Sequence, residues 1–266
     1  QSIFPMKRYG FIGYGNMGRA VLLSLLGKDS IAPDKVMVYN RTPDRLKELS
    51  ASYPDVVIAS DPPKIARASD VLFLCTDSSA VLSVLEDLSP YIDMRTHVVS
   101  INGGISIEEI EARHNGPVSR VIPTIIMTSG HGLTLITHGC RVPLAMQMDL
   151  QALFQRCSKV KVLAEDDLVR YTDLTSCAPG LLAMMVEAFV QAGARSSGLP
   201  LKEVQEVLLE TLVGTASILA KGSESTHGLM EKVATKGGIT EKGLRVLEME
   251  LPSTFDHMFE ATRKAR

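Results

Sequence analysis

The sequence lacks the features that mark metal-binding, disulfide-rich, nucleic-acid-binding or membrane proteins. Its four cysteines form no Cys-x-x-Cys pair, which argues against a metal site or a disulfide framework and suits a reducing cytoplasm. Lys and Arg total 28 against 30 Asp and Glu, so no basic field indicates nucleic acid or a membrane surface as a partner. No apolar run reaches membrane-spanning length and no signal peptide is visible, so we expect a cytoplasmic protein.

Length and composition are those of an ordinary globular protein. The chain has 266 residues, of which 45% are hydrophobic and 22% charged, and this is enough for two domains with full cores. We interpret Gln1 to Pro5 as a remnant of expression and Met6 as the natural start. The fold prediction therefore begins at Met6.

The start of the chain carries a glycine pattern typical of dinucleotide-binding folds. A short apolar strand, Tyr9 to Ile12, leads into Gly13-x-Gly15-x-x-Gly18, and an apolar helix follows. In such a fold the three glycines make a tight turn, admit the pyrophosphate and allow close helix–strand packing, in that order. The helix N-terminus then offers free N–H groups to the phosphates. The predicted cofactor contacts are Gly13, Tyr14, Gly15, Asn16, Met17 and Gly18.

The turn after the second strand identifies the cofactor more closely. Asn40-Arg41-Thr42 follows the apolar segment Val36 to Tyr39, about 20 residues past the last glycine. An NAD-specific site usually has a carboxylate there, which would repel the 2′-phosphate of NADP. Arg41 instead offers a planar donor fork, and Asn40 and Thr42 add neutral hydrogen-bonding groups. We therefore expect NADPH rather than NADH.

Alternating strands and helices predict an α/β sheet with helices on both faces. Strands are expected at 56–58, 71–75, 96–101, 118–122, 133–137 and 160–162, and helices at 43–52, 78–88, 143–154 and after a capping box formed by Ser106 and Glu109. Ligands of such sheets gather at the carboxyl ends of the strands. That rule places Cys75, Thr76, Asn102, Gly103, Pro123 and Thr124 around the nicotinamide end of the cleft.

Strand patterns disappear beyond about residue 163. We predict a Rossmann-type dinucleotide-binding domain over residues 6–163 and an all-α dimerisation domain over residues 164–266. The stretch from Asp173 to Ser197 is apolar around most of its circumference, and Leu201 to Lys221 continues the pattern. Such helices must be buried by other elements, so we expect an intertwined homodimer or a higher oligomer of dimers. A compact monomeric bundle is the alternative.

A glycine-rich segment near the C-terminus has the properties of a carboxylate cradle. Gly237 and Gly238 leave backbone N–H groups bare, and Thr235 and Thr240 supply hydroxyls at the start of a helix. Taken alone, the segment is equally consistent with an ordinary Gly-Gly turn capped by Thr240.

Along its whole length the chain resembles the pyrroline-5-carboxylate reductase family. The family's S-P-G-G-T-T and G-L-x-x-L-E signatures correspond to Thr235–Thr240 and Gly243–Glu248, and the opening Gly-Tyr-Gly-Asn-Met-Gly and the Asn-Arg-Thr turn are also similar. The resemblance implies NADPH-dependent reduction of a cyclic imine, 1-pyrroline-5-carboxylate, to proline, in sites near a dimer interface. It implies Thr240 and Thr235 as catalytic residues and Gly237, Gly238, Ile239, Pro123, Thr124 and Cys177 as substrate contacts. It implies no metal-binding residue.

The chain departs from the family mainly in the substrate half. Cys75-Thr76-Asp77 stands where the family commonly has Val-Lys-Pro, and Lys236 stands where it has proline. Residues 122–126 replace the family's M-P-N-T-P, and residues 175–181 replace its S-G-S-G-P-A-Y. A branch of the family linked to late competence genes shows similar changes. Reduction of another imine and a catalytically silent, NADPH-binding regulatory paralogue are therefore alternatives. A 3-hydroxyacid dehydrogenase is disfavoured, because residues 173–197 contain no lysine to act as its acid/base.

Overall fold

The computed structural model describes residues 7–265, so the predicted start at Met6 lies outside the described residues. The chain divides into two compact units, Gln1–Pro179 and Gly180–Arg266, and each is described by itself. The domain boundary between residues 163 and 164 stays a prediction.

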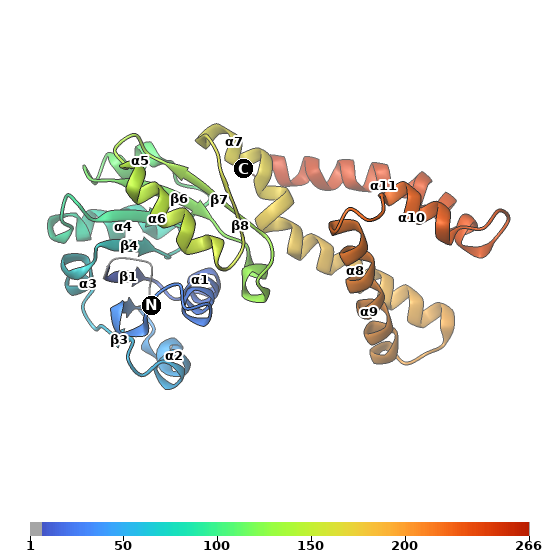
Figure 1. Ribbon diagram of the computed structural model, residues 1–266, viewed down its shortest axis with the longest axis horizontal. Coiled ribbons are helices and arrows are strands. Elements are labelled where there is room, and N and C mark those ends of the chain that lie inside the picture. Colours follow the sequence, from blue (N-terminus) through green and yellow to red (C-terminus); the bar gives the residue numbers. More distant parts are fainter. Residues whose placement is uncertain (1–6, 266) are drawn as a thin grey trace. The chain divides into compact units, whose positions relative to one another are not determined.

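The first unit is built on an eight-stranded sheet (Figure 1). Its strands are β1 (Tyr9–Ile12), β2 (Val36–Tyr39), β3 (Val57–Ile58), β4 (Val71–Leu74), β5 (His97–Ser100), β6 (Val118–Ile122), β7 (Leu133–His138) and β8 (Lys159–Val162). Strands β3-β2-β1-β4-β5-β6 are parallel and follow the Rossmann order, whereas β7 runs antiparallel to β6 and β8 parallel to β7. The predicted fold class is confirmed.

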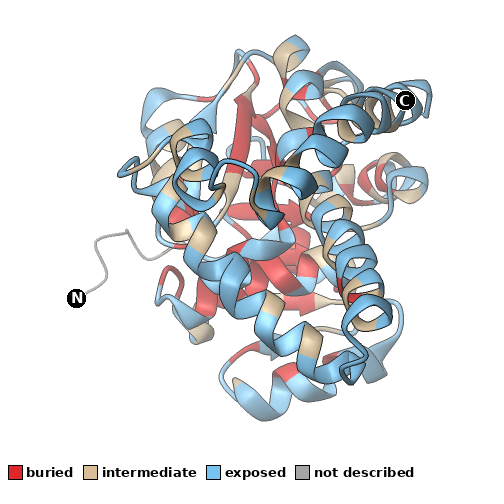
Figure 2. Ribbon diagram, turned by 90° about the vertical axis from the view of Figure 1, so that its right-hand side faces the viewer, coloured by how far each residue is buried: buried red, intermediate tan, exposed pale blue. Residues whose placement is uncertain are grey.

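Helices cover both faces of this sheet, because its central strands are apolar on both sides. The helices are α1 (Asn16–Gly27), α2 (Lys47–Ser52), α3 (Pro62–Ala68), α4 (Ser78–Leu88), α5 (Ile107–Glu111), α6 (Leu144–Gln155) and α7 (Glu165–Thr172). Side chains of α1, α2 and α6 join one buried cluster, and those of α3, α4 and α5 join another. Phe73 of β4 links sheet and helices, since its ring stacks on Phe11 at 4.6 Å and meets Phe154 of α6 edge-on. Figure 2 shows the buried residues concentrated in these strands.

Two local features differ from, or refine, the sequence prediction in the first unit. Helix α3 was not expected, although Pro62 at its first position is a recognised helix start. The predicted helix over 43–52 begins as a 3₁₀ turn, Pro43–Leu46, before α2. The capping box of Ser106 and Glu109 is confirmed, since each side chain bonds the other residue's backbone N–H.

The helix predicted to start at Asp173 begins eight residues earlier, at Glu165. It runs as α7, then a π-helical segment, Asp173–Cys177, and then α8 (Ala178–Ser197). The prediction placed the start too late because the acidic first turn of α7 has no apolar face of its own. Acidic residues there suit the positive end of the helix dipole.

The helices of the second unit leave large apolar side chains exposed. This unit holds the rest of α8 together with α9 (Leu201–Ala220), α10 (Thr226–Val233) and α11 (Ile239–Lys264). Phe189 and Met184 of α8 are each 65% exposed, and Val207 of α9 is 63% exposed. One chain therefore does not supply the burial that the apolar pattern requires.

One helix in the described chain, Glu165–Ser197, is long and apolar enough to cross a membrane by length and composition alone. The expectation that no apolar run has that length is therefore wrong. It failed because residues 174–194, across the π-helical segment and α8, carry a single charged side chain, Glu187. The same exposed apolar face is what an interface with another copy of the chain would bury.

A row of buried polar side chains crosses three strands of the sheet. The Nε2 atom of His97 lies 2.7 Å from the Ser119 hydroxyl, which lies 2.8 Å from Nδ1 of His138. Burial, and then the neighbouring His138, lower the pKa of His97 from 6.5 to about 3. Burial also lowers the pKa of His138 and that of nearby His114. These imidazoles are therefore held in their neutral forms.

We predict that the protein loses stability as the pH falls below about 6.5, because the unfolded histidines then bind protons that the folded ones exclude. The stabilisation is complete above 6.5 and is lost progressively toward the folded pKa of about 3. Urea unfolding at about pH 8 and about pH 5 measures the loss. His97→Gln keeps a hydrogen-bonding group beside Ser119 but does not titrate, so it should lose less. Exposed His131→Gln is the control, and an equal loss in all three proteins would contradict the prediction.

Candidate functional site

The three glycines of the opening motif have three different surroundings. Gly13 has a φ of +101°, and an added Cβ would lie 2.7 Å from the carbonyl oxygen of Cys75. A Cβ on Gly18 would lie 2.9 Å from the Cβ of Cys75 and 3.0 Å from the carbonyl oxygen of Gly13. Gly15 has nothing within 4 Å of that position. Two glycines therefore allow close packing, and the third leaves an open face of backbone.

Helix α1 begins directly at this open face. Gly15 is its N-cap, and no side chain caps the helix or places an acidic group in its first turn. The first amides of the helix have no carbonyl partner within it, as at any helix start. Free amides, the positive dipole end and a bare glycine together form a site that suits a phosphate.

The turn after β2 is tied to the glycine loop. The side-chain oxygen of Asn40 accepts a hydrogen bond from the backbone N–H of Tyr14 at 2.9 Å, and its amide nitrogen donates to the carbonyl of Thr42 at 2.8 Å. Asn40 therefore holds the two loops together. Arg41, between these anchors, is exposed. Its guanidinium is the group of this turn that is placed to meet an anion in solvent.

Buried polar atoms without a protein partner lie at the ends of β4 and β5. The hydroxyl of Thr76 and the side-chain nitrogen of Asn102 are both buried and make no hydrogen bond, although the Asn102 oxygen accepts from Ser78 at 3.0 Å. Leaving such groups unpaired costs about 1–3 kcal/mol each, so they indicate a polar ligand. Gly103 has open space where a side chain would lie. These residues fit the nicotinamide half of a dinucleotide.

Cys75 packs the glycine turn rather than acting as a nucleophile. It is buried, and burial raises the pKa of its thiol, which keeps it protonated. Its backbone and Cβ are the atoms that Gly13 and Gly18 approach. Cys75 therefore packs against the glycine turn, and its predicted contact with the cofactor stays a prediction.

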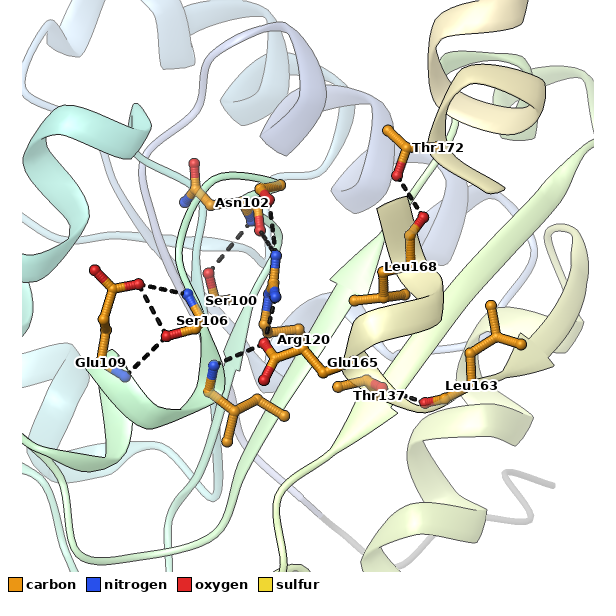
Figure 3. A network of polar contacts seen from close by, with 12 residues as sticks. Ser100, Asn102, Ser106, Glu109, Arg120, Thr137, Leu163, Glu165, Leu168 and Thr172 are labelled. Carbon is orange, nitrogen blue, oxygen red and sulfur yellow. Dashed lines mark hydrogen bonds and ion pairs between the residues drawn. The ribbon is translucent and has the colours of Figure 1, made fainter. Parts of the chain in front are cut away.

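Sequence analysis missed a partly buried ion pair beside this site (Figure 3). Arg120 of β6 is 6% exposed, and its Nη1 atom pairs with the Glu165 carboxylate at the start of α7. Its Nη2 atom donates to the Gly103 carbonyl at 2.8 Å. The signal in the sequence was a single arginine inside an otherwise uncharged strand.

Thr124 and the helical segment that carries Cys177 lie together in the first unit. The Thr124 hydroxyl is fully buried and donates to the carbonyl of Thr175 at 3.3 Å. Pro179 has no N–H to give to that carbonyl, which lies four residues before it. Cys177 itself is exposed. The structure therefore places Thr124 against the helical segment that carries Cys177, and the role of Pro123, Thr124 and Cys177 as substrate contacts stays a prediction.

The amides of both cradle glycines, in the second unit, are already bonded. The N–H of Gly238 donates to the Thr235 carbonyl at 2.8 Å, and the N–H of Gly237 donates to the Glu241 carboxylate at 2.5 Å. Glu241 also accepts from Arg245 at 2.9 Å. The Gly237 hydrogen bond, followed by that of Arg245, lowers the pKa of Glu241. A carboxylate thus already lies at the edge of this turn.

The free donors of the cradle are the next amides along the chain. Gly238, not Thr240, is the N-cap of α11, and no side chain makes a cap hydrogen bond. The alternative prediction, a Gly-Gly turn capped by Thr240, is therefore wrong. The amides of Ile239 and Thr240 belong to the first turn of α11, where the helix offers no acceptor. Ile239 is 90% exposed, so this helix start is open to a ligand.

A Rossmann-type sheet with these free donors, followed by apolar helices, defines a two-domain nicotinamide-dinucleotide oxidoreductase. Comparison with known proteins gives the family. The family described as pyrroline-5-carboxylate reductase dimerisation matches residues 165–266, and that described as NADP oxidoreductase coenzyme F420-dependent matches residues 8–104. Pyrroline-5-carboxylate reductase 3 of Bacillus subtilis is 32% identical over 97% of this chain and 94% of its own length. The chain belongs to the pyrroline-5-carboxylate reductase family.

Two further comparisons agree with the sequence predictions. ComE operon protein 4 of Bacillus subtilis is 25% identical over 96% of this chain and 93% of its own length, which confirms the likeness to the competence-linked branch. The crystal structure of Plasmodium falciparum pyrroline carboxylate reductase with NADP bound has the same fold, with a TM-score of 0.85 and 22% identity over 97% and 95% of the two chains. The predicted cofactor class, NADP, is confirmed at the level of the family.

The glycines allow a matched test of the cofactor site. Gly15→Ala should leave the melting temperature unchanged, since nothing lies within 4 Å, but should weaken NADPH binding about tenfold or more because the Cβ meets the phosphates. Gly18→Ala should lower both, because its Cβ would lie 2.9 Å from Cys75. Calorimetric melting and fluorescence titration with NADPH separate the two effects. Unchanged NADPH affinity in Gly15→Ala would exclude the phosphate from this face.

Proposed function

We propose that this protein reduces 1-pyrroline-5-carboxylate to L-proline with NADPH, as a cytoplasmic homodimer or a larger assembly of dimers. The observation that carries the proposal is the open start of α11, where the amides of Ile239 and Thr240 lie beside the Gly237-Gly238 turn. This segment corresponds to the family's S-P-G-G-T-T signature, with Thr235, Lys236 and Ile239 in place of Ser, Pro and Thr. A relative 32% identical over nearly the whole chain is named a pyrroline-5-carboxylate reductase.

In this proposal the cofactor domain comprises residues 6–163. The proposed contacts are Gly13, Tyr14, Gly15, Asn16, Met17 and Gly18 for the pyrophosphate half, Arg41 and Thr42 for the 2′-phosphate, and Cys75, Thr76, Asn102 and Gly103 for the nicotinamide half. Asn40 supports them by fixing the Tyr14 backbone. The unpaired groups of Thr76 and Asn102 support this placement. The bound cofactor supplies the hydride.

Substrate contacts are proposed in each unit, taken by itself. Amides of Ile239 and Thr240 bind the carboxylate, while Gly237 and Gly238 shape the turn, because their own amides are already bonded. The hydroxyls of Thr240 and Thr235 complete the polar contacts, and Pro123, Thr124 and Cys177 border the ring of the imine. A protonated imine is already an electrophile, so the chain supplies orientation and electrostatics rather than a strong acid. The domain proposed for dimerisation and substrate binding covers residues 164–266.

A second candidate is a regulatory paralogue that binds NADPH without turnover, or a reductase of a different imine. The relative named ComE operon protein 4 and the altered substrate half favour it. Ser176, which replaces a family glycine, gives its hydroxyl to the Thr172 carbonyl at 3.3 Å and so adds bulk without a free donor.

We predict that pyrroline-5-carboxylate will oxidise NADPH in the presence of the purified protein, and that NADH will react more slowly. The reason is Arg41, which offers a partner to the 2′-phosphate where an acidic residue would repel it. Loss of absorbance at the reduced-nicotinamide band measures the rate. No oxidation alongside tight NADPH binding would favour the second candidate.

We predict that Thr240→Ala will lower kcat about tenfold or more and leave the Kd for NADPH unchanged, because its hydroxyl serves the substrate alone. Thr240→Ser keeps the hydroxyl and is the matched control. Steady-state kinetics and NADPH titration give the two quantities. Similar losses in both would remove Thr240 from the substrate side.

A further inference from the structure

Arg120 is a buried charge that the proposed reaction does not use. A guanidinium inside a sheet is costly unless it is paired and hydrogen-bonded. The two terminal nitrogens of Arg120 have three partners: the Glu165 carboxylate, the Gly103 carbonyl at 2.8 Å and the Asn102 carbonyl at 3.5 Å, whereas its Nε atom is buried and unpaired. Two of these partners are the loop residues that end β5 beside the unpaired groups of the cofactor site.

Glu165 extends the same network to two helices. Its Oε1 atom accepts from Arg120 and also from the backbone N–H of Ile107, at 2.8 Å, in the first turn of α5. Glu165 is itself the first residue of α7, where the match to the dimerisation family begins. One carboxylate and one guanidinium thus join β6, the loop after β5, α5 and α7 (Figure 3).

The network determines which groups of the loop remain for a ligand. The carbonyls of Asn102 and Gly103 are held on Arg120, and the Asn102 side-chain oxygen is held by Ser78. The Asn102 side-chain nitrogen stays buried and unpaired, and Gly103 keeps an open face. With the two carbonyls fixed on Arg120, the groups that remain for a ligand are the Asn102 side-chain nitrogen and the open backbone of Gly103.

We propose that the Arg120–Glu165 pair positions the Asn102–Gly103 loop for the nicotinamide half of the cofactor, and so makes that half's affinity depend on α7. The proposal rests on the cofactor site proposed above. Arg120 and Glu165 act through the loop and touch no reacting atom, so both are positioning residues. A lysine keeps the charge but cannot direct separate donors to a carboxylate and to two carbonyls in one plane.

The test compares two ligands that share one half. NADPH covers the whole site, whereas adenosine 2′,5′-bisphosphate carries the adenosine and 2′-phosphate but no nicotinamide. Arg120→Lys and Glu165→Gln should each raise the Kd for NADPH about tenfold and leave the Kd for the bisphosphate within about twofold. Titration calorimetry on the full-length variants gives both constants, and their melting temperatures are measured alongside.

An exposed ion pair elsewhere in the unit is the matched control. Arg113 pairs with Glu86 at 2.6 Å, with side chains 29% and 56% exposed. Arg113→Lys and Glu86→Gln should alter neither Kd. The double variant of Arg120 and Glu165 should lose no more NADPH affinity than the worse single variant, because both residues serve one network.

Each result decides the proposal. Equal losses for both ligands, or unchanged NADPH affinity in Glu165→Gln, would overturn it and leave a purely structural ion pair. Should Arg120→Lys fail to fold, Glu165→Gln decides alone, since its side chain keeps the same shape. If the unmodified protein binds neither ligand, the proposed cofactor site fails instead, and that outcome is distinct from loss of the pair's effect.

Discussion

The close approach of α1 to the end of β4 is the contact on which the cofactor site depends. It exists because Gly13 and Gly18 leave no side chain between the turn, the helix and Cys75. That approach directs the start of α1 toward the carboxyl ends of the strands, where Thr76 and Asn102 keep unpaired polar atoms. The proposed phosphate site and the proposed nicotinamide site therefore depend on one packing constraint, and Asn40 holds the turn after β2 to the glycine loop.

The two units meet the need for burial in different ways. In the first unit, helices cover both faces of an apolar sheet, so the chain completes its own core. In the second unit, α8 and α9 keep side chains such as Phe189 and Val207 exposed. The family match to a dimerisation domain covers this region. The apolar pattern of these helices is therefore best understood as surface reserved for another copy of the chain.

Sequence patterns were informative wherever a single segment determines its own structure. The strands, the glycine turn and the Ser106 capping box follow from local periodicity and from residue types at fixed spacing. Arg120 and Glu165 are 45 residues apart, and only the folded sheet brings them together. The use of the Gly237 amide by Glu241 depends on a side-chain conformation that spacing does not specify. Polar pairing through side chains, both long-range and local, was thus the part that the sequence could not reveal.

The sheet is joined to the helix that starts at Glu165 by two bonds of different physical origin. The Arg120–Glu165 pair depends on charge, and dissolved salt screens it from its exposed side. The Thr124 hydroxyl donates to the Thr175 carbonyl, which cannot accept from Pro179 because proline has no backbone N–H. This bond joins two uncharged groups. The ion pair therefore weakens as the salt concentration rises, whereas the neutral Thr124 bond does not, and this bond keeps the helix attached to the segment after β6.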